Sequence, residues 1–539
     1  MGAPGLVAIV ANAVPGRAMS DKFQPIPMES LAAWVFGELE ASGSIFGIPR
    51  ELFFTPRARD PFATEVYGRR LETPFGVAAG PHSQMAQNIV AAWLCGARFI
   101  ELKTVQTLDE LDVSKPCIDL QDEGYNCEWS QELKVRQSFD EYLRAWVLIH
   151  ALHRQLGFPG DAPGMVFNVS VGYNLEGLLQ PNMQEYLRLV GDAGDLRAQY
   201  VGLIARYVPG LQVPARLSDN VTLSTMHGCP PGEIEKIAAY LVEEWGFHTN
   251  VKLNPTLLGP GRLREILNER LGYADTVVPD LAFEHDLKYA DAVPMLRRLQ
   301  AVAKKRKVQF GVKLSNTLEV ENRRDVFPKK EKMMYLSGRA LHAVTVNLAA
   351  KLSAEFGGGL MMSFSAGADA FNAPRLLACG MKTVTVCSDI LKTGGYLRLP
   401  QYLENTAAAM KKARAKNLPA FAKDAPASLA AYADEVLEDR RYRKETFDTS
   451  RTKTVRPLGL FDCIKAPCTD ECPVNQKVPQ YMGLVREGRF DDAVEVVRQD
   501  NPLGAILGRA CNHLCEQVCV RTHLDEPLAI REMKRFIMD

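Results

Sequence analysis

The chain has 539 residues, too many for a single hydrophobic core, so at least two domains are expected. Lysine plus arginine and aspartate plus glutamate both total 64, so the net charge is zero and does not favour a nucleic-acid or anionic-membrane partner. The apolar and charged fractions, 47% and 24%, are those of a globular protein, and no apolar run reaches the roughly 18–20 residues of a membrane helix.

The N-terminal residues 1–18, MGAPGLVAIVANAVPGRA, are mildly apolar but carry no positively charged start, which argues against a secretory signal. Because Met19 would serve equally well as a start, we interpret this segment as a disordered or mis-assigned extension. Twelve cysteines in a chain without an export signal indicate thiols or metal ligands and a cytoplasmic location.

Short apolar segments alternate with helical ones between Phe75 and Asp389, the pattern of a parallel α/β fold. Eight strands are predicted: FGVAAG from Phe75, FIELKTV from Phe99, MVFNVSV from Met165, NVTLSTM from Asn220, HTNVKLNP from His248, VQFGVKLSN from Val308, MMSFSAG from Met361 and KTVTVCSD from Lys382. Several are apolar at nearly every position, as strands covered on both faces are. Eight βα units predict a closed (β/α)8 TIM barrel.

An open doubly wound sheet is the alternative, but no glycine-rich turn follows the first strand as a dinucleotide site requires. Between strands four and five, EIEKIAAYLVEEWG repeats apolar residues from Ile234 to Trp245 at three- and four-residue intervals and predicts an amphipathic helix. The segment TVVPDLAFE from Thr276 does not fit the count of strands, and we assign it to an insertion.

The composition shifts after the barrel to alanine, lysine, glutamate and arginine, which predicts a helical connector, and then to a cysteine-rich tail. Helices are predicted in the tail at VPQYMGLVREG and DDAVEVVRQ. The predicted domains are the extension 1–18, the barrel with its N-terminal segment 19–402, the connector 403–450 and a small all-α domain 451–539.

The active site of a parallel barrel forms where the strands end, and here those ends are polar. The candidate residues are Gly80, His82, Lys103, Thr104, Asn174, Thr225, His227, Lys252, Asn316, Thr317, Gly367, Cys387 and Ser388. Two lysines and two asparagines suit an electron-rich ring with carbonyl edges, because lysine stabilises negative charge and amides supply both donors and acceptors. Backbone amides at Ala366–Gly367 and Cys387–Ser388 are placed for the usual barrel phosphate site.

Six cysteines fall in two groups near the C-terminus, Cys463-x4-Cys468-x3-Cys472-Pro473 and Cys511-x3-Cys515-x3-Cys519. A C-x3-C-P ending is shared with ferredoxin runs that bind a four-iron cube. Zinc is the alternative, but structural zinc sites generally use C-x2-C pairs and neither group has one. We therefore predict iron–sulfur ligation by these six thiolates.

The segments TPFGVAAG, IELKT, GYN, LSTMHG, VKLNP, SNT, LSGRAL and VTVCSDIL resemble, in order, the FMN-binding barrel of dihydroorotate and dihydropyrimidine dehydrogenases. The resemblance extends from Thr73 to Tyr396. It implies that Gly80, Lys103, Thr104 and Lys252 surround the flavin ring, that Ser337, Gly338, Ala366, Gly367, Cys387 and Ser388 line its ribityl and phosphate end, and that Asn174, Asn316 and Thr317 face a planar amide substrate.

The sequence departs from that family at its catalytic loop. Thr225 stands where the family has a catalytic cysteine or serine, with His227 nearby, and Thr222 stands where it has an asparagine. Threonine is a poorer acid or base than cysteine, so the substrate and the direction of reaction stay open. In addition, Ala366–Gly367 stands where one phosphate loop of that family has two glycines.

The tail is similar to the helical iron–sulfur domain of glutamate synthase small subunits and dihydropyrimidine dehydrogenases. The similarity implies two [4Fe–4S] clusters, one sharing Cys463, Cys468 and Cys519 and the other Cys472, Cys511 and Cys515. A single cluster is the alternative. Leu460 replaces the first cysteine of that pattern, and its non-cysteine ligand falls near Lys534, with Glu532 close by, so the fourth ligands stay open.

The order of barrel and tail resembles, from Phe23 onward, a YgfK-like family that carries the name selenate reductase and is found beside purine-catabolism functions. In that family an FAD- and NAD(P)H-binding domain follows, so a flavoprotein partner subunit or a missing C-terminal domain is expected. The implied function is an iron–sulfur flavoprotein oxidoreductase that passes electrons from NAD(P)H through the clusters to FMN, and on to a purine- or pyrimidine-like ring or another small acceptor. Selenate suits this barrel less well, because oxyanion reduction usually needs molybdenum chemistry. A non-catalytic electron-transfer or scaffold subunit is the alternative.

Overall fold

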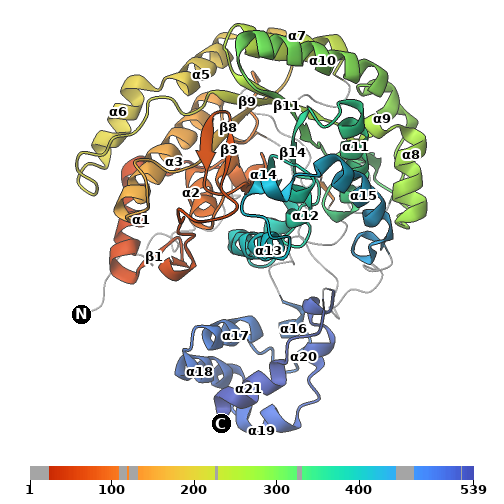
Figure 1. Cartoon of the computed structure of the whole chain (residues 1–539). Helices are drawn as coiled ribbons and strands as arrows, with labels where there is room; N and C mark the ends of the chain where they lie inside the picture. Colours follow the sequence, from red (N-terminus) through yellow and green to blue (C-terminus); the bar gives the residue numbers. More distant parts are fainter. Residues whose placement is uncertain are drawn as a thin grey trace.

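A computed structural model describes residues 23–108, 118–119, 131–224, 229–323, 331–444, 466–523 and 525–539. Eight parallel strands close into a barrel in sequence order (Figure 1): β5 Phe75–Val77, β6 Phe99–Glu101, β8 Val166–Val171, β9 Asn220–Leu223, β10 His248–Leu253, β11 Phe310–Leu314, β14 Met361–Phe364 and β15 Thr383–Val386. Each lies in one of the eight segments predicted from the sequence, so the prediction of a TIM barrel is confirmed. Because β15 pairs with β5, the sheet has no open edge and the doubly wound alternative is wrong.

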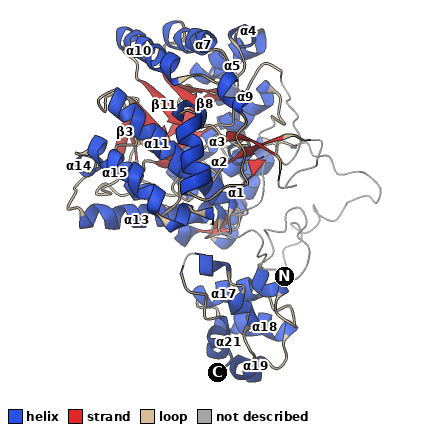
Figure 2. Ribbon diagram, turned by 90° about the vertical axis from the view of Figure 1, so that its right-hand side faces the viewer, coloured by secondary structure: helices blue, strands red, loops and turns tan. Residues whose placement is uncertain are grey.

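A helix follows each barrel strand and packs on the outside, so that the strands are enclosed by helices (Figure 2). In chain order these helices are α2 Ala86–Leu94, α3 Val135–Gln155, α5 Pro181–Gly191, α7 Pro231–Glu243, α10 Tyr289–Arg306, α11 Arg339–Glu355, α12 Ala373–Ala378 and α13 Leu399–Lys412. Shorter or peripheral helices are α1 Met28–Ser42, α4 Leu175–Leu178, α6 Gly194–Leu203, α8 Pro260–Arg264 and α9 Asp280–His285. The strands β5, β6, β8, β9, β11 and β15 are buried at every position, as expected for strands covered on both faces.

The helix predicted after the fourth strand is α7, and its apolar face from Ile234 to Val242 is buried. The helix ends at Glu243, so the assignment of Trp245 to it was wrong, although Trp245 still packs against the core. The segment from Thr276 forms no strand and leads into α9, which agrees with its assignment to an insertion.

A hairpin of β3 Thr64–Val66 and β4 Arg69–Leu71 covers the N-terminal end of the barrel. Its Tyr67 forms a small apolar cluster with Phe99 and Val166, the first residues of β6 and β8. The Tyr67 hydroxyl also accepts a hydrogen bond from Nδ2 of Asn250 at 2.5 Å. The end at which a ligand could enter the barrel is therefore the opposite one, where the strands run out.

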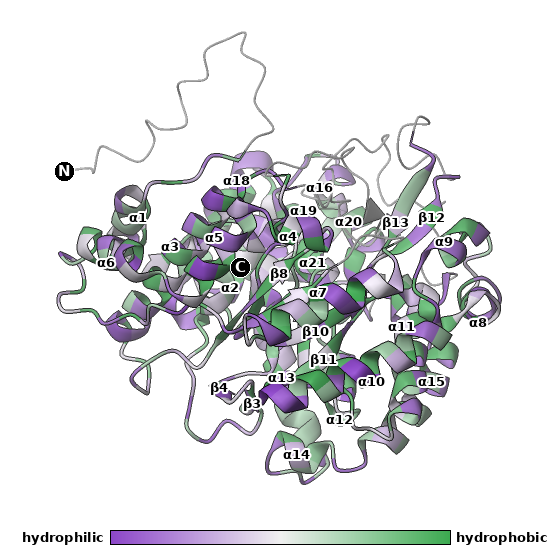
Figure 3. Cartoon of the chain, turned by 90° about the horizontal axis from the view of Figure 1, so that it is seen from above, coloured by the Kyte–Doolittle hydropathy of each residue, from purple (hydrophilic) through white to green (hydrophobic). Residues whose placement is uncertain are grey.

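A three-stranded sheet rises from that C-terminal end, built from the connections after β6 and β11. Its strands are β7 Ile118–Asp119, β12 Leu318–Glu321 and β13 Met333–Leu336, and β12 and β13 pair side by side (Figure 3). A further two-stranded sheet, β1 Ser44–Ile45 with β2 Ile48–Pro49, follows α1.

The segment predicted as a connector contains α14 Leu418–Phe421 and α15 Ala425–Glu438, and α15 packs along α11 of the barrel. The tail forms a separate body with its own core, made by Val478, Tyr481, Val497 and their neighbours (Figure 1). Its helices are α16 Pro467–Asp470, α17 Val478–Arg486, α18 Phe490–Asp500, α19 Gly504–Ala510, α20 Leu514–Gln517 and α21 Ile530–Met538. The two helices predicted in the tail are confirmed as α17 and α18. Among the described residues, we find no helix with the length and apolarity needed to span a bilayer.

Candidate functional site

Three of the predicted side chains meet at the C-terminal end of the barrel. Lys103 follows β6, Lys252 lies near the end of β10 and Cys387 follows β15. Burial lowers the pKa of Lys252 to about 8; the Glu101 carboxylate opposes this shift, and the charges of Lys313 and Lys103 add to it. Lys252 is also in register with Lys313 of the neighbouring strand, and Lys313 pairs with Glu101, two residues before Lys103. The mouth of the barrel therefore offers lysine nitrogens that can stabilise negative charge on a bound group.

A buried ion pair next to these lysines was not predicted. Lys313 of β11, in register with Lys252, donates to the Glu101 carboxylate of β6. The Thr385 hydroxyl donates to the same carboxylate oxygen at 3.2 Å, and the backbone N–H of Ala79 donates to the other oxygen at 3.3 Å. A charge buried in this way needs a partner, and the pair supplies one. The signal in the sequence was a charged residue inside each of two otherwise apolar strands.

Two glycines approach closely at the edge of the mouth. Gly338 has φ +75° and Gly367 has φ +59°, both in the region that glycine favours. A Cβ on Gly367 would lie 2.5 Å from the carbonyl oxygen of Gly338, so no larger residue fits there without moving the backbone. The hydroxyls of Ser337 and Ser388 lie 3.3 Å apart beside them. The structure thus brings together the ends of β13, β14 and β15 that were predicted to bind phosphate.

We call the two loops Ser337–Gly338 and Ala366–Gly367 the glycine cradle. The carbonyls of Ala366 and Gly367 are turned toward the protein. The Ala366 carbonyl lies 2.8 Å from Nδ1 of His342, and the Gly367 carbonyl accepts from Nδ2 of Asn372 at 2.9 Å. Because a trans peptide directs its N–H opposite its C=O, the amide of Gly367 points away from His342. The amides of Gly338 and Gly367 donate to no residue in the described part of the chain. These donors, at the start of the 17-residue helix α11, suit a phosphate group.

Side chains from the connector hold this cradle in place, which the sequence did not reveal. His342 Nε2 lies 2.9 Å from the Tyr432 hydroxyl, and the His342 ring stacks on Tyr442 at 4.8 Å. Asn372 also donates to the Tyr442 hydroxyl at 3.2 Å. Burial lowers the pKa of His342 to about 3, so the ring is neutral and Nδ1 can carry the proton given to Ala366. Residues 425–442 thus act on the site through His342 and Asn372.

His82 lies in the same mouth and is 7% exposed. Its Nδ1 lies 3.9 Å from Sγ of Cys387, and its backbone carbonyl accepts from the Tyr396 hydroxyl at 2.7 Å. The other ring nitrogen, Nε2, is buried without a hydrogen-bond partner among the described residues. A Cβ on Gly80 would lie 2.6 Å from the His82 ring, so the ring can lie this close to the backbone only because residue 80 has no side chain. A buried polar atom of this kind suits a ligand that brings its own donor or acceptor.

The predicted substrate-facing residues are placed less uniformly. Asn316 is 8% exposed and donates to Oδ1 of Asn254 at 2.6 Å, which adds Asn254 to the site although it was not predicted. Asn174 instead caps helix α4, because its Oδ1 accepts from the Gly177 amide at 2.8 Å. Its amide nitrogen and one lone pair of Oδ1 stay available to a ligand.

Two other predicted residues lie beside the strand ends. The Thr104 hydroxyl lies 2.8 Å from that of Ser170, and Thr317 is partly exposed just before β12. The two predicted catalytic residues, Thr225 and His227, lie outside the described residues.

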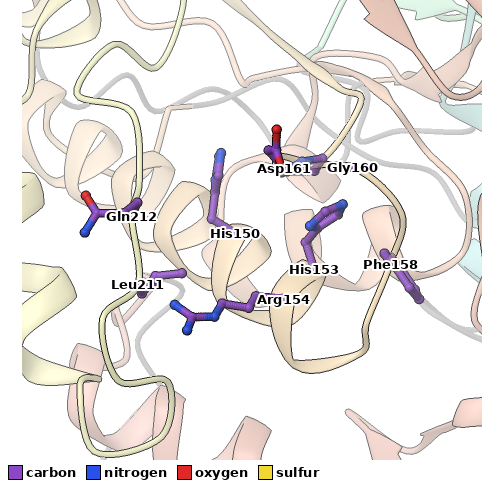
Figure 4. A pocket seen from close by; sticks show the side chains of 9 residues that line it. His150, His153, Arg154, Phe158, Gly160, Asp161, Leu211 and Gln212 are labelled. Carbon is purple, nitrogen blue, oxygen red and sulfur yellow. The ribbon is translucent and has the colours of Figure 1, made fainter.

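A solvent-open cavity of about 320 Å³ lies elsewhere, at the end of α3 (Figure 4). His150 and His153 line it, but each ring nitrogen that bonds does so to a backbone carbonyl, at 2.8 and 3.2 Å. Burial lowers the pKa of His150 to about 4, so that ring is neutral. The cavity contains no predicted site residue and lies near the start of β8, on the covered side of the barrel.

Five of the six tail cysteines are described, and each is a free thiol; Cys463 lies outside the described residues. Burial raises the pKa of Cys515 to about 11, and the charges of Glu516, Cys472, Cys511 and Cys468 add to the shift. Thiols gathered in this way repel one another's negative charge, an effect that bound iron would reverse. The donor set therefore fits an iron–sulfur group.

The described thiols do not form a single-ion site. Within the described ranges, we find no group of three or more histidine, cysteine, aspartate or glutamate side chains placed to hold one metal ion. A four-iron cube differs from such a site because each thiolate binds a different iron, so its ligands stand farther apart.

Two family models together match nearly the whole chain. Residues 46–444 match the oxidoreductase YgfK N-terminal TIM-barrel domain, and residues 445–539 match dihydropyrimidine dehydrogenase domain II, 4Fe-4S cluster. The chain is 41% identical, over 97% of its length, to the protein of Escherichia coli K12 named "Putative oxidoreductase YgfK", of which it covers 52%. The chain thus spans about half the length of the curated relatives it matches over most of its sequence.

Other relatives match over shorter stretches. The NADP(+)-dependent formate dehydrogenase subunit beta of Moorella thermoacetica is 42% identical over 14% of this chain and 11% of its own. The NADPH-Fe(3+) oxidoreductase subunit beta of Geobacter sulfurreducens is 33% identical over 19% of this chain and 16% of its own. The crystal structure of ligand-free type DHODH from Eimeria tenella aligns with a TM-score of 0.44 and 13% identity, covering 73% of this chain and 97% of that chain, a likeness too weak to inform the site.

The barrel match alone covers well over half of the residues, and a 4Fe-4S domain follows it. The chain therefore belongs to the YgfK oxidoreductase family.

Proposed function

We propose that this chain is the barrel and cluster part of an iron–sulfur flavoprotein oxidoreductase that binds FMN in the barrel mouth. The observation that carries the proposal is the pairing, at one end of the barrel, of lysine nitrogens with a glycine cradle whose amides donate to no described residue. A flavin mononucleotide needs both, since its ring gains negative charge on reduction and its other end is a phosphate. FMN accepts electrons singly and delivers them as a pair, which connects one-electron clusters to a two-electron substrate.

The residues of the mouth divide into three tasks in this proposal. Lys103 and Lys252 stabilise charge on the ring, and the amides of Gly338 and Gly367 bind the phosphate. Asn316, held by Asn254, faces the substrate side with an amide that can pair with a planar ring of purine or pyrimidine type. A buried, polar mouth of this kind suits such a ring better than it suits selenate.

The six tail cysteines, Cys463 among them, are proposed to hold two [4Fe–4S] clusters. These clusters pass electrons to the barrel. Support for a flavoprotein partner that uses NAD(P)H comes from the relatives. Besides the two beta subunits, the chain matches the NAD-dependent dihydropyrimidine dehydrogenase subunit PreT of Salmonella typhimurium, with 34% identity over 79 residues. The partner would be a separate FAD-binding subunit or a further domain of the same polypeptide.

The test is the cofactor content of the full chain after anaerobic reconstitution. We expect one FMN per chain and roughly eight irons, or roughly four if a single cube forms. Iron without FMN would refute the enzyme and favour the alternative of an electron-transfer scaffold. With an added flavoprotein partner and NAD(P)H, reduction of uracil, xanthine or urate is expected; no turnover of any of them would refute the ring substrate while leaving cofactor binding intact.

A further inference from the structure

A buried lysine in the tail lies beside one of the cluster cysteines. Lys534 of α21 is 7% exposed, and its Nζ lies 3.7 Å from Sγ of Cys511. Among the described residues, Oε1 of Gln476 is a second polar neighbour of Nζ, at 3.5 Å. In the sequence, Lys534 is only the position near which the non-cysteine ligand of the resembled family falls.

In the part of the chain that the structure describes, the charge of this lysine has no carboxylate to neutralise it. Among the described residues, no aspartate or glutamate oxygen lies within 4.0 Å of Lys534, and the nearest acid on its own helix, Glu532, pairs with Arg531 and Arg535. Burying an ammonium group is costly unless an anion compensates it. The sulfur of Cys511 is the group beside it that can carry negative charge, and it does so when it binds iron.

Gln476 fixes the lysine without supplying that charge. Its Nε2 donates to the Val497 carbonyl at 3.2 Å, and its Oε1 also accepts from Nδ2 of Asn501 at 3.3 Å. The amide is therefore held at both ends and oriented with its oxygen toward Lys534. The ammonium group of Lys534 has three donors and no lone pair with which to bind iron. Its position beside an oxygen and a sulfur therefore favours hydrogen bonding over iron ligation.

The close contact of α19 and α21 explains how Cys511 reaches this lysine. A Cβ on Gly508 would lie 3.1 Å from Cα of Arg535, so the two helix backbones almost touch. Cys511 follows directly at the end of α19, where its carbonyl accepts from Arg531 at 3.3 Å. One helix, α21, thus contacts both the backbone and the sulfur of the same cysteine.

We propose that Lys534 is a positioning and charge-compensating residue that donates a hydrogen bond to the Cys511 thiolate and raises the reduction potential of the cluster which Cys511 ligates. Adding an electron makes a cluster more negative, and a fixed cation beside its sulfur favours that state. This inference rests on the proposed function in one respect, namely that the tail holds a cluster. It goes further by assigning a role to a residue that ligates nothing.

The experiment compares the reconstituted full chain with Lys534→Met, Lys534→Leu and Lys534→Arg. Lys477→Met is the matched control, because Lys477 is an exposed lysine of the same domain that pairs with Asp500. Iron and sulfide are measured for each, followed by a potentiometric titration monitored by electron paramagnetic resonance. Both neutral variants should keep the iron of the wild type and lower one midpoint potential by at least about 59 mV, which is a tenfold change in the oxidised-to-reduced ratio at a fixed potential.

Lys534→Arg should retain most of the wild-type potential, and Lys477→Met should leave it unchanged. Full iron with an unchanged midpoint in the neutral variants would overturn the inference and leave the proposed function standing. Loss of iron in Lys534→Met, Lys534→Leu and Lys534→Arg alike would also overturn it, because Lys534 would then be needed for cluster assembly. A wild-type chain that takes up no iron would instead refute the proposed function itself.

Discussion

The substitution Gly367→Ala tests whether the glycine cradle binds the phosphate of a flavin. The new Cβ would lie 2.5 Å from the Gly338 carbonyl oxygen and 2.9 Å from its carbon, both backbone atoms that cannot rotate away. The backbone of Gly367, at φ +59°, also disfavours any residue with a side chain, by about 1–2 kcal/mol. Relieving the overlap would add about 1–3 kcal/mol and move Gly338 at the start of α11.

Gly357→Ala is the matched control for this change. Gly357 has φ +56° at the far end of α11, but a Cβ there meets no atom within 4 Å. It therefore carries the conformational cost alone, and the difference between the two variants isolates the overlap within the cradle.

Flavin fluorescence titration of the apoprotein, with chemical denaturation in parallel, measures both effects. We expect Gly367→Ala to be the less stable variant by about 1–3 kcal/mol and to bind FMN at least tenfold more weakly, equivalent to about 1.4 kcal/mol. Gly357→Ala should bind FMN as the wild type does. If Gly367→Ala bound FMN with undiminished affinity, the phosphate could not lie in this cradle.

Two further predictions concern the charge and the support of the site. Because burial lowers the pKa of Lys252 to about 8, its positive charge is lost between pH 7 and 9.5, so FMN affinity should fall over that range in the wild type and stay flat in Lys252→Met. The stability of the apoprotein should change with the opposite sign, rising with pH above 8, because the unfolded chain then binds the proton that folded Lys252 releases; a fall attributable to Lys252 would contradict the burial. Tyr442→Phe removes a hydroxyl that accepts from Asn372, so FMN affinity should drop about fivefold, the effect of one hydrogen bond near 1 kcal/mol. Tyr289→Phe, which removes an exposed hydroxyl bonded to the Lys351 carbonyl, is its control and should bind FMN normally; equal affinity of both variants would mean that the connector does not support the cradle.

The sequence determined the barrel and the general composition of its mouth. The apolar pattern of a buried strand is contained in a few consecutive residues, so eight such segments alternating with helices could be found without knowing which strands pair. All eight contain barrel strands. Eight βα units favour a closed barrel, the pairing of β15 with β5 decides it, and the C-terminal strand ends of such a barrel must meet. The same local reasoning located the cysteine groups, because their spacing along the chain is itself the signal.

The tertiary structure decided which distant residues support those sites. Lys313 and Glu101 are 212 residues apart, His342 and Tyr432 are 90 apart, and Lys534 and Cys511 meet only because α19 and α21 touch. Each of these residues looks like an ordinary polar side chain in its own segment. Its role arises from the cost of burying a charge or a polar atom, and only the folded chain shows which atom offsets that cost.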